Sequence, residues 1–172
     1  KPAGLLTTHK DTEARATVFE HLPIGLPRVI SVGRLDLNSE GLLLLTNNGE
    51  LSRKLELPEN GGSRRYKVRV HGFVNKNKLA DLAKGATVDG INYGPVKVEL
   101  ESQNGTNSWL VVTLSEGKNR EIRKLMKSIE LEVARLIRLS YGPFQLGSLK
   151  KGEVREVPQK VLKEQLGSKI NL

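Results

Sequence analysis

The stretch that decides the fold of this chain lies at residues 32–46 and reads Val32-Gly33-Arg34-Leu35-Asp36-Leu37-Asn38-Ser39-Glu40-Gly41-Leu42-Leu43-Leu44-Leu45-Thr46. It sets a carboxylate, Asp36, two residues after an arginine and shortly before a run of four leucines. The leucine run predicts a strand over residues 42–46 that is buried on both faces, and residues 28–32 predict another strand. Asp36 is therefore expected in a buried turn between two core elements. Because a buried carboxylate is unfavourable without a partner, the sequence predicts a cation beside it.

The composition indicates which class of partner the chain binds. Its 172 residues include 28 Lys and Arg against 19 Asp and Glu, a net charge of +9, which is typical of proteins that bind nucleic acid. The chain has no cysteine, which excludes disulfides and thiolate metal sites, and its three histidines show no ligand spacing. No apolar run approaches the roughly 18 residues that span a bilayer, and no signal peptide opens the chain. We therefore expect a cytoplasmic protein with no membrane partner.

The pattern of apolar residues predicts an α+β fold, a mostly antiparallel mixed sheet with flanking helices. A short helical stretch is expected after Thr17, which would cap it together with Glu20. A flexible link near 59–64 suggests a boundary between two lobes. The further predicted elements are helices over 50–56, 76–84 and 158–166, a helix after Asn119, strands over 65–71, 96–100, 109–114 and 133–139, and a hairpin turn at 103–107.

Residues 65–71 alternate in the way a strand with one packed face does. Tyr66, Val68 and Val70 share the apolar face, and the other face is basic, with Arg65, Lys67, Arg69 and His71. Tyr66 has two interpretations. It is either a core aromatic with a wet hydroxyl or a flat surface against a nucleic-acid base.

The segment Glu116-Gly117-Lys118-Asn119 leads into the predicted helix, and Gly117 permits an unusual backbone there. The helix has one apolar stripe, with Arg120, Lys124 and Lys127 on its far side and Arg123 at the flank of the stripe. One interpretation is an amphipathic helix with a solvated basic face. The other is that Arg123 points inward at Asp36, since a guanidinium stays charged and binds a carboxylate in a fork. Arg34 similarly either caps a turn or reaches into a nucleic-acid stack.

Five blocks of the sequence, taken together, carry a resemblance to a known family. The blocks are Lys1-Pro2-Ala3-Gly4, Gly33-Arg34-Leu35-Asp36, Ser39-Glu40-Gly41-Leu42-Leu43-Leu44-Leu45-Thr46-Asn47-Asn48-Gly49, Arg65-Tyr66-Lys67-Val68 and Glu116-Gly117-Lys118-Asn119-Arg120-Glu121-Ile122-Arg123-Lys124-Leu125-Met126. They resemble the bacterial pseudouridine synthases of the small-subunit/large-subunit ribosomal RNA family. The residues of the block around Asn119–Arg123 look most like the members that modify 23S RNA.

The resemblance implies a pseudouridine synthase-like catalytic core with a central cleft over residues 1–172. It implies that Asp36 is the catalytic aspartate, that Tyr66 stacks on the target uracil and that Arg123 pairs with the aspartate. Arg34 matches the residue that enters the stack when the uridine is flipped out. Members commonly carry an S4-type RNA-binding domain before this core, which we expect to lie outside this chain. The residues expected to bind RNA are Arg34, Arg65, Lys67, Lys118, Arg120 and Lys124.

The chemistry of such an isomerase agrees with a chain that has no metal or nucleotide motif. The N1–C1′ bond breaks, the base rotates and C5 rejoins the sugar, so no redox or energy input is needed and no cofactor or metal is expected. Everting the uridine costs a few kcal/mol. Asp36 then acts either as a nucleophile or as the base that removes the C2′ proton, and the sequence leaves both routes open. Arg123 would keep Asp36 ionised and oriented.

We expect the partner to be ribosomal RNA, 23S or a large-subunit precursor particle, and the protein to be a monomer. One alternative function is a non-catalytic RNA-binding or ribosome-assembly module, for which the basic surfaces would suffice. Another is the same reaction on a different nucleic acid such as tRNA.

Overall fold

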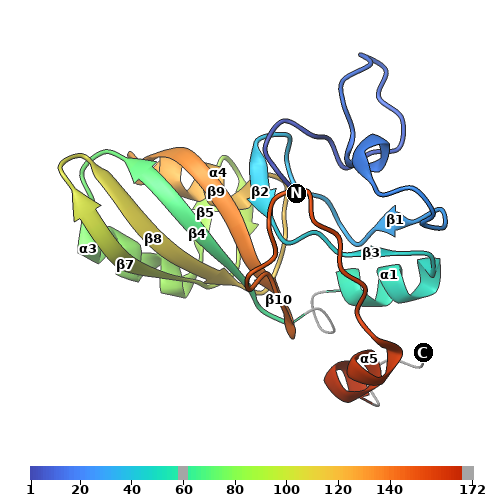
Figure 1. Cartoon of the computed structure of the whole chain (residues 1–172). Helices are drawn as coiled ribbons and strands as arrows, with labels where there is room; N and C mark the ends of the chain where they lie inside the picture. Colours follow the sequence, from blue (N-terminus) through green and yellow to red (C-terminus); the bar gives the residue numbers. More distant parts are fainter. Residues whose placement is uncertain (58–61, 168–172) are drawn as a thin grey trace.

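A computed structural model describes residues 1–57 and 62–167 of the chain. The helices and strands alternate irregularly along it, as in an α+β protein (Figure 1). They are η1 (Val18–His21), β1 (Ile30–Ser31), β2 (Ser39–Gly41), β3 (Leu45–Thr46), α1 (Gly49–Glu56), β4 (Arg64–His71), α3 (Lys76–Asp81), η2 (Leu82–Lys84), β5 (Ala86–Val88), β6 (Ile91–Tyr93), β7 (Val96–Asn104), β8 (Asn107–Leu114), α4 (Glu121–Ser128), β9 (Glu132–Tyr141), β10 (Phe144–Gln145) and α5 (Gln159–Leu166).

The main sheet has the strand order β10-β9-β4-β8-β7, with β2 added beside β9. All its pairs are antiparallel except β2 with β9, which is parallel. This confirms the predicted mixed, mostly antiparallel sheet. Two short ribbons, β1-β3 and β5-β6, lie outside it. No helix within the described residues is long and apolar enough to cross a membrane.

The alternation predicted for β4 is confirmed, because Tyr66, Val68 and Val70 are buried whereas Arg65 and Arg69 are exposed. The buried face packs against α3 and α4. Those helices supply buried apolar side chains to the same core as β4, β8 and β9, namely Leu79, Ile122, Leu125 and Met126. The predicted helix over 158–166 and the hairpin at 103–107 are also present.

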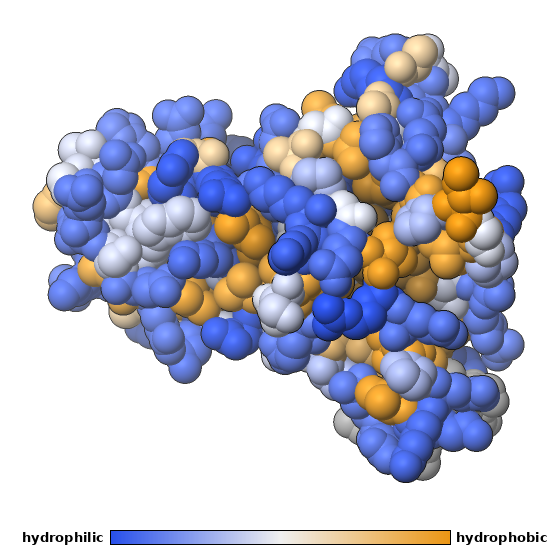
Figure 2. Space-filling model, in the orientation of Figure 1, coloured by the Kyte–Doolittle hydropathy of each residue, from blue (hydrophilic) through white to orange (hydrophobic). Residues whose placement is uncertain are grey.

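A second apolar cluster joins α1, α5, the ends of β9 and β10, and the chain between β1 and β3. Its buried members are Val32, Leu42, Leu55, Tyr141, Phe144 and Leu166. Figure 2 shows hydrophobic residues in the region of β1 and β3, with smaller patches along the sheet and at α5, between hydrophilic residues. Residues 59–61 of the predicted lobe boundary at 59–64 lie outside the described residues, so that boundary stays a prediction.

The leucine run does not form the doubly buried strand that its composition predicts. Only Leu42 is buried, and the strands lie on either side of the run, β2 before it and β3 at its end. The buried strand is the polar β2, because its backbone lies directly against β9. A Cβ added at Gly41 would lie 2.2 Å from the Arg138 carbonyl oxygen, so only glycine fits there.

The predicted cap at Thr17 is also wrong. Thr17 precedes η1, a 3₁₀-helix, and its side chain makes no capping hydrogen bond. Its neighbour Val18 donates its N–H to the Leu6 carbonyl at 2.8 Å, so the strand-like N-terminal segment satisfies this end of the helix instead.

Candidate active site

The loop that carries Asp36 is held by backbone contacts. The Ser39 N–H donates to the Asp36 carbonyl at 3.0 Å, which closes a tight turn. The Lys1 ammonium donates to the carbonyls of Leu37 at 3.1 Å and Ser39 at 2.6 Å. Burial lowers the pKa of Lys1 to about 8, although the charges of Asp36 and Glu40 oppose the shift. Lys1 therefore positions the turn, a role that the sequence did not indicate.

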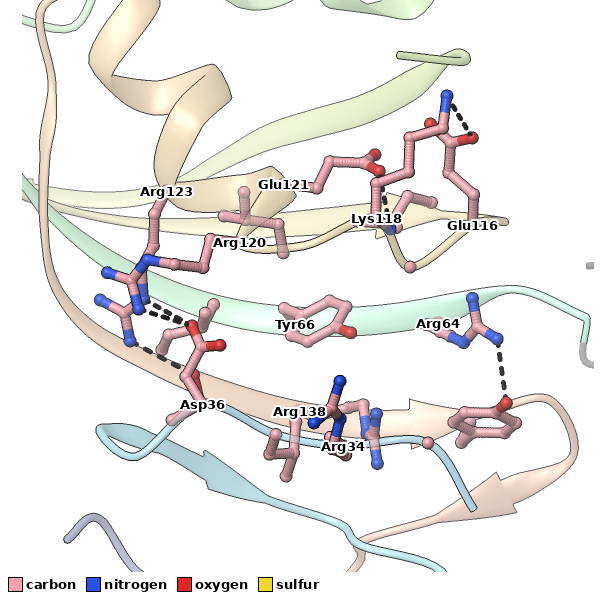
Figure 3. Close-up of a pocket in the computed structure, with 18 of the residues that line it drawn as sticks. Arg34, Asp36, Arg64, Tyr66, Glu116, Lys118, Arg120, Glu121, Arg123 and Arg138 are labelled. Carbon is pink, nitrogen blue, oxygen red and sulfur yellow. Dashed lines mark hydrogen bonds and ion pairs between the residues drawn. The ribbon is translucent and has the colours of Figure 1, made fainter. Parts of the chain in front are cut away.

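Asp36 has the cationic partner that its position predicted. Its Oδ2 accepts from Arg123 Nε at 3.1 Å and from Arg120 Nη1 at 3.2 Å (Figure 3). The second donor of Arg123, Nη2, reaches Ser39 Oγ at 3.2 Å, so one guanidinium joins α4 to the Asp36 turn. The expectation that Asp36 is buried is wrong, because its side chain is 26% exposed.

Arg120 does not lie on the far, solvated side of α4 as the helical wheel predicted. It precedes the helix in a left-handed conformation with φ 50°, which turns its side chain toward Asp36. Its side chain is 51% exposed, against 16% for Arg123. The two arginines thus approach one carboxylate oxygen, Arg120 from the solvent side and Arg123 from the packed side.

A cavity of about 400 Å³ opens beside this cluster. Tyr66, 8% exposed, comes from β4 and lies between Asp36 and Arg64 in the cavity wall (Figure 3). The charged side chains that line the cavity are six cations and four carboxylates. They are Arg34, Arg64, Lys118, Arg120, Arg123 and Arg138, with Asp36, Glu56, Glu116 and Glu121.

The structure brings six of the nine predicted site residues into this cavity: Arg34, Asp36, Tyr66, Lys118, Arg120 and Arg123. Arg65, Lys67 and Lys124 are not among its lining residues. Arg65 is exposed on the outer face of β4, and the Lys67 ammonium lies 4.8 Å from the ring centre of Trp109 on that face. Any RNA contact by these three residues lies outside the cavity.

The sequence analysis did not identify two arginines of the cavity wall. Arg64 and Arg138 are 5% and 3% exposed. Arg64 shares the inward face of β4 with Tyr66, and the alternation would have placed it there had the predicted strand begun one residue earlier. Arg138 pairs with Tyr66 across β4 and β9, a register that the sequence does not reveal.

The first residue of α4 is a buried acid that the sequence analysis did not identify. Glu121 is 3% exposed, and burial, with the nearby charge of Glu116 as a second cause, raises its pKa to about 7. Glu116 accepts the Gly94 N–H at 2.8 Å. The predicted unusual backbone at Gly117 is absent, since its φ is not positive. Its lack of a side chain instead admits Arg64, whose Nη1 would lie 3.2 Å from an added Cβ.

Comparisons with known proteins place this chain and its fold in a class. The sequence model of the family described as RNA pseudouridylate synthase matches residues 1–128. The chain belongs to this family of RNA pseudouridine synthases, which are isomerases.

Two curated relatives and two solved structures define the likeness further. An uncharacterized RNA pseudouridine synthase of Rickettsia typhi is 51% identical over 99% of this chain and 69% of its own length. The ribosomal large subunit pseudouridine synthase B of Salmonella typhi is 44% identical over 85% of the chain and 50% of its own length. A crystal structure of a pseudouridylate synthase superposes with a TM-score of 0.82 at 29% identity, over 96% of this chain and 70% of that one. The similarity to a chain of an H/ACA RNP bound to a substrate RNA is limited to the fold. The TM-score is 0.60 at 20% identity, over 84% of this chain and 46% of that one.

Proposed function

We propose that this chain converts uridine into pseudouridine in the ribosomal RNA of the large subunit, with Asp36 as its catalytic group. The observation that carries the proposal is the carboxylate of Asp36, held by Arg123 and Arg120 beside a cavity that also contains Tyr66. The substrate is inferred from the relative in Salmonella typhi, which is named for the large subunit.

The side chains of the cavity supply each step of such a reaction. The cationic lining attracts the RNA backbone, and the exposed Arg34 fills the stack that the everted uridine leaves. Tyr66 offers its ring to the uracil. Asp36 then attacks C1′ or removes the C2′ proton, and both routes need an oriented, ionised carboxylate. Arg123 and Arg120 provide that orientation because they donate to the same oxygen.

A non-catalytic RNA-binding module is the less favoured alternative, since such a module needs no arginine-held carboxylate in a cavity. We further propose that residues 1–172 form one catalytic domain, which an S4-type domain precedes in the whole protein. Outside the cavity, the basic side chains of Arg65, Lys67 and Lys124 would contact phosphates. The protein would work as a monomer in the cytoplasm, on 23S RNA or a precursor particle.

Replacing Asp36 by asparagine tests the proposal most directly. Asp36→Asn should bind RNA nearly as well as the unaltered chain but form no pseudouridine, because the amide neither attacks C1′ nor accepts the proton. Product is mapped by carbodiimide labelling and primer extension on 23S RNA, 16S RNA and tRNA side by side. Asp81→Asn, on the exposed side of α3, is the matched control and should retain full activity. Modification retained by Asp36→Asn would refute the role given to Asp36, and product on 16S RNA or tRNA alone would refute the substrate.

A further inference from the structure

Arg64 and Arg138 are two buried cations whose guanidinium groups lie over the same ring, that of Tyr141. No ion pair joins either guanidinium to a carboxylate in the part of the chain that the structure describes. One nitrogen of each guanidinium, Arg64 Nη1 and Arg138 Nη2, is buried and has no acceptor among the described residues. Burial lowers the pKa of Arg138, with the charge of Arg64 as a minor further cause, although interactions with Tyr66 and Tyr141 oppose the shift. Two like charges placed this way oppose folding, since apolar residues of similar size would leave the protein as stable or more so.

The pair is nevertheless held rigidly. Arg64 Nη2 donates to the Tyr141 hydroxyl at 2.9 Å, and that hydroxyl donates to the Leu55 carbonyl at 2.9 Å. Arg138 Nε donates to the Leu42 carbonyl at 2.8 Å. The two guanidinium carbons lie 4.5 and 5.0 Å from the centre of the Tyr141 ring. This fixed geometry suits a site prepared for a negative charge, because its donors need no rearrangement when the charge arrives.

The position of the pair indicates where that charge develops. Arg138 lies beside Tyr66 across the strand pair, and both line the cavity. Asp36 lies on one side of Tyr66 and Arg64 on the other (Figure 3). A nucleotide with its sugar at Asp36 and its base on Tyr66 would direct the carbonyl edge of the base toward the two arginines.

We propose that Arg64 and Arg138 form a subsite that binds the carbonyl oxygens of the uracil and stabilises the anion formed when the base detaches. This inference rests on the proposed function. When the N1–C1′ bond breaks, its electron pair stays on N1 and is shared with O2 and O4. Either C1′ bonds to the Asp36 carboxylate, or Asp36 takes the proton from C2′ and the C2′–H electron pair forms a C1′=C2′ double bond. C5 of the anion then bonds to C1′, displacing that carboxylate or with return of the C2′ proton, after which C5 loses its hydrogen as a proton and N1 gains one. Charge on the base is therefore largest between the two bond changes, where the arginines act.

Arg138→Met tests this subsite. The rate of tritium release from a 23S RNA transcript that contains [5-³H]uridine, measured with enzyme in saturating excess, should fall by about 100-fold or more, as when one such donor is removed. The Kd for the transcript should stay within about twofold of the unaltered value, because no phosphate contact is lost. Arg138→Lys keeps the positive charge but not the two-pronged guanidinium, so its rate of tritium release should fall less than that of Arg138→Met. Arg64→Met is an independent test, and it should also lower the rate of tritium release with little change in Kd. Arg53→Met, on the exposed side of α1 and away from the basic face of β4, is the matched control.

A second substrate separates this inference from a structural or phosphate-binding role. Fluorine at C5 stabilises the uracil anion, so the loss caused by Arg138→Met should shrink at least several-fold on a transcript with 5-fluorouridine, followed by consumption of that nucleoside in digests. An undiminished rate in Arg138→Met, with the unaltered chain active, overturns this inference alone. An equal loss on both transcripts also overturns it, and a weaker Kd with a reduced salt dependence would assign the pair to a phosphodiester instead. An unaltered chain that forms no pseudouridine overturns the proposed function itself.

Discussion

The two arginines that hold Asp36 should contribute unequally to turnover. Each donates one hydrogen bond to the same Oδ2, at 3.1 Å from Arg123 and 3.2 Å from Arg120, but their side chains are 16% and 51% exposed. A shielded hydrogen bond between charged groups contributes about 1.5–3 kcal/mol, whereas an exposed ion pair contributes about 0–1 kcal/mol. Since about 1.4 kcal/mol corresponds to a tenfold change in rate, Arg123→Met should slow the reaction roughly 10- to 150-fold and Arg120→Met at most about fivefold.

Tritium release from [5-³H]uridine in a 23S RNA transcript, under single-turnover conditions, measures this difference, and filter binding measures the Kd. Lys127→Met on the exposed face of α4 serves as the control for loss of one positive charge. Arg123→Lys should lie between the two variants, because one ammonium cannot reproduce the fork to Asp36 and Ser39. Equal losses in Arg123→Met and Arg120→Met, or a larger loss in Arg120→Met, would refute the argument from shielding.

Two stability predictions follow from buried groups near the cavity. Gly41→Ala should lower the free energy of unfolding in urea by more than about 4 kcal/mol, since its Cβ would meet the Arg138 carbonyl at 2.2 Å; Gly105→Ala, also at positive φ but in open space, should cost about 1–2 kcal/mol, and equal costs would contradict the steric reason. The pKa of Glu121, about 7 in the folded chain against 4.5 as its ordinary value, means that the folded state binds more protons between these pH values. The free energy of unfolding should therefore fall by about 1–3 kcal/mol as the pH rises from 4.5 to above 7. Glu121→Gln should remove this fall in urea titrations at pH 5 and pH 8, and an unchanged pH dependence would assign it to other groups.

Local sequence patterns were sufficient to predict the elements whose structure depends on residues close together in the sequence. The alternation around Tyr66, the turn at 103–107 and the apolar stripe before Ile129 each depend on contacts within a few residues. The leucine run led to a wrong prediction because its residues are apolar, yet only Leu42 of them is buried in the core. The buried strand there is β2, whose place depends on a parallel partner about a hundred residues away.

The same division applies to the site. The need of Asp36 for a cation and the inward position of Tyr66 could be inferred from residue types alone, because charge and alternation are local properties. Three features became visible only with the strands assembled. Arg120 precedes α4 and turns toward Asp36, Arg138 lies beside Tyr66, and no carboxylate of the described residues pairs with Arg64 or Arg138. Register between distant strands depends on how all the side chains of a sheet pack at once, and no short segment of the chain contains that information.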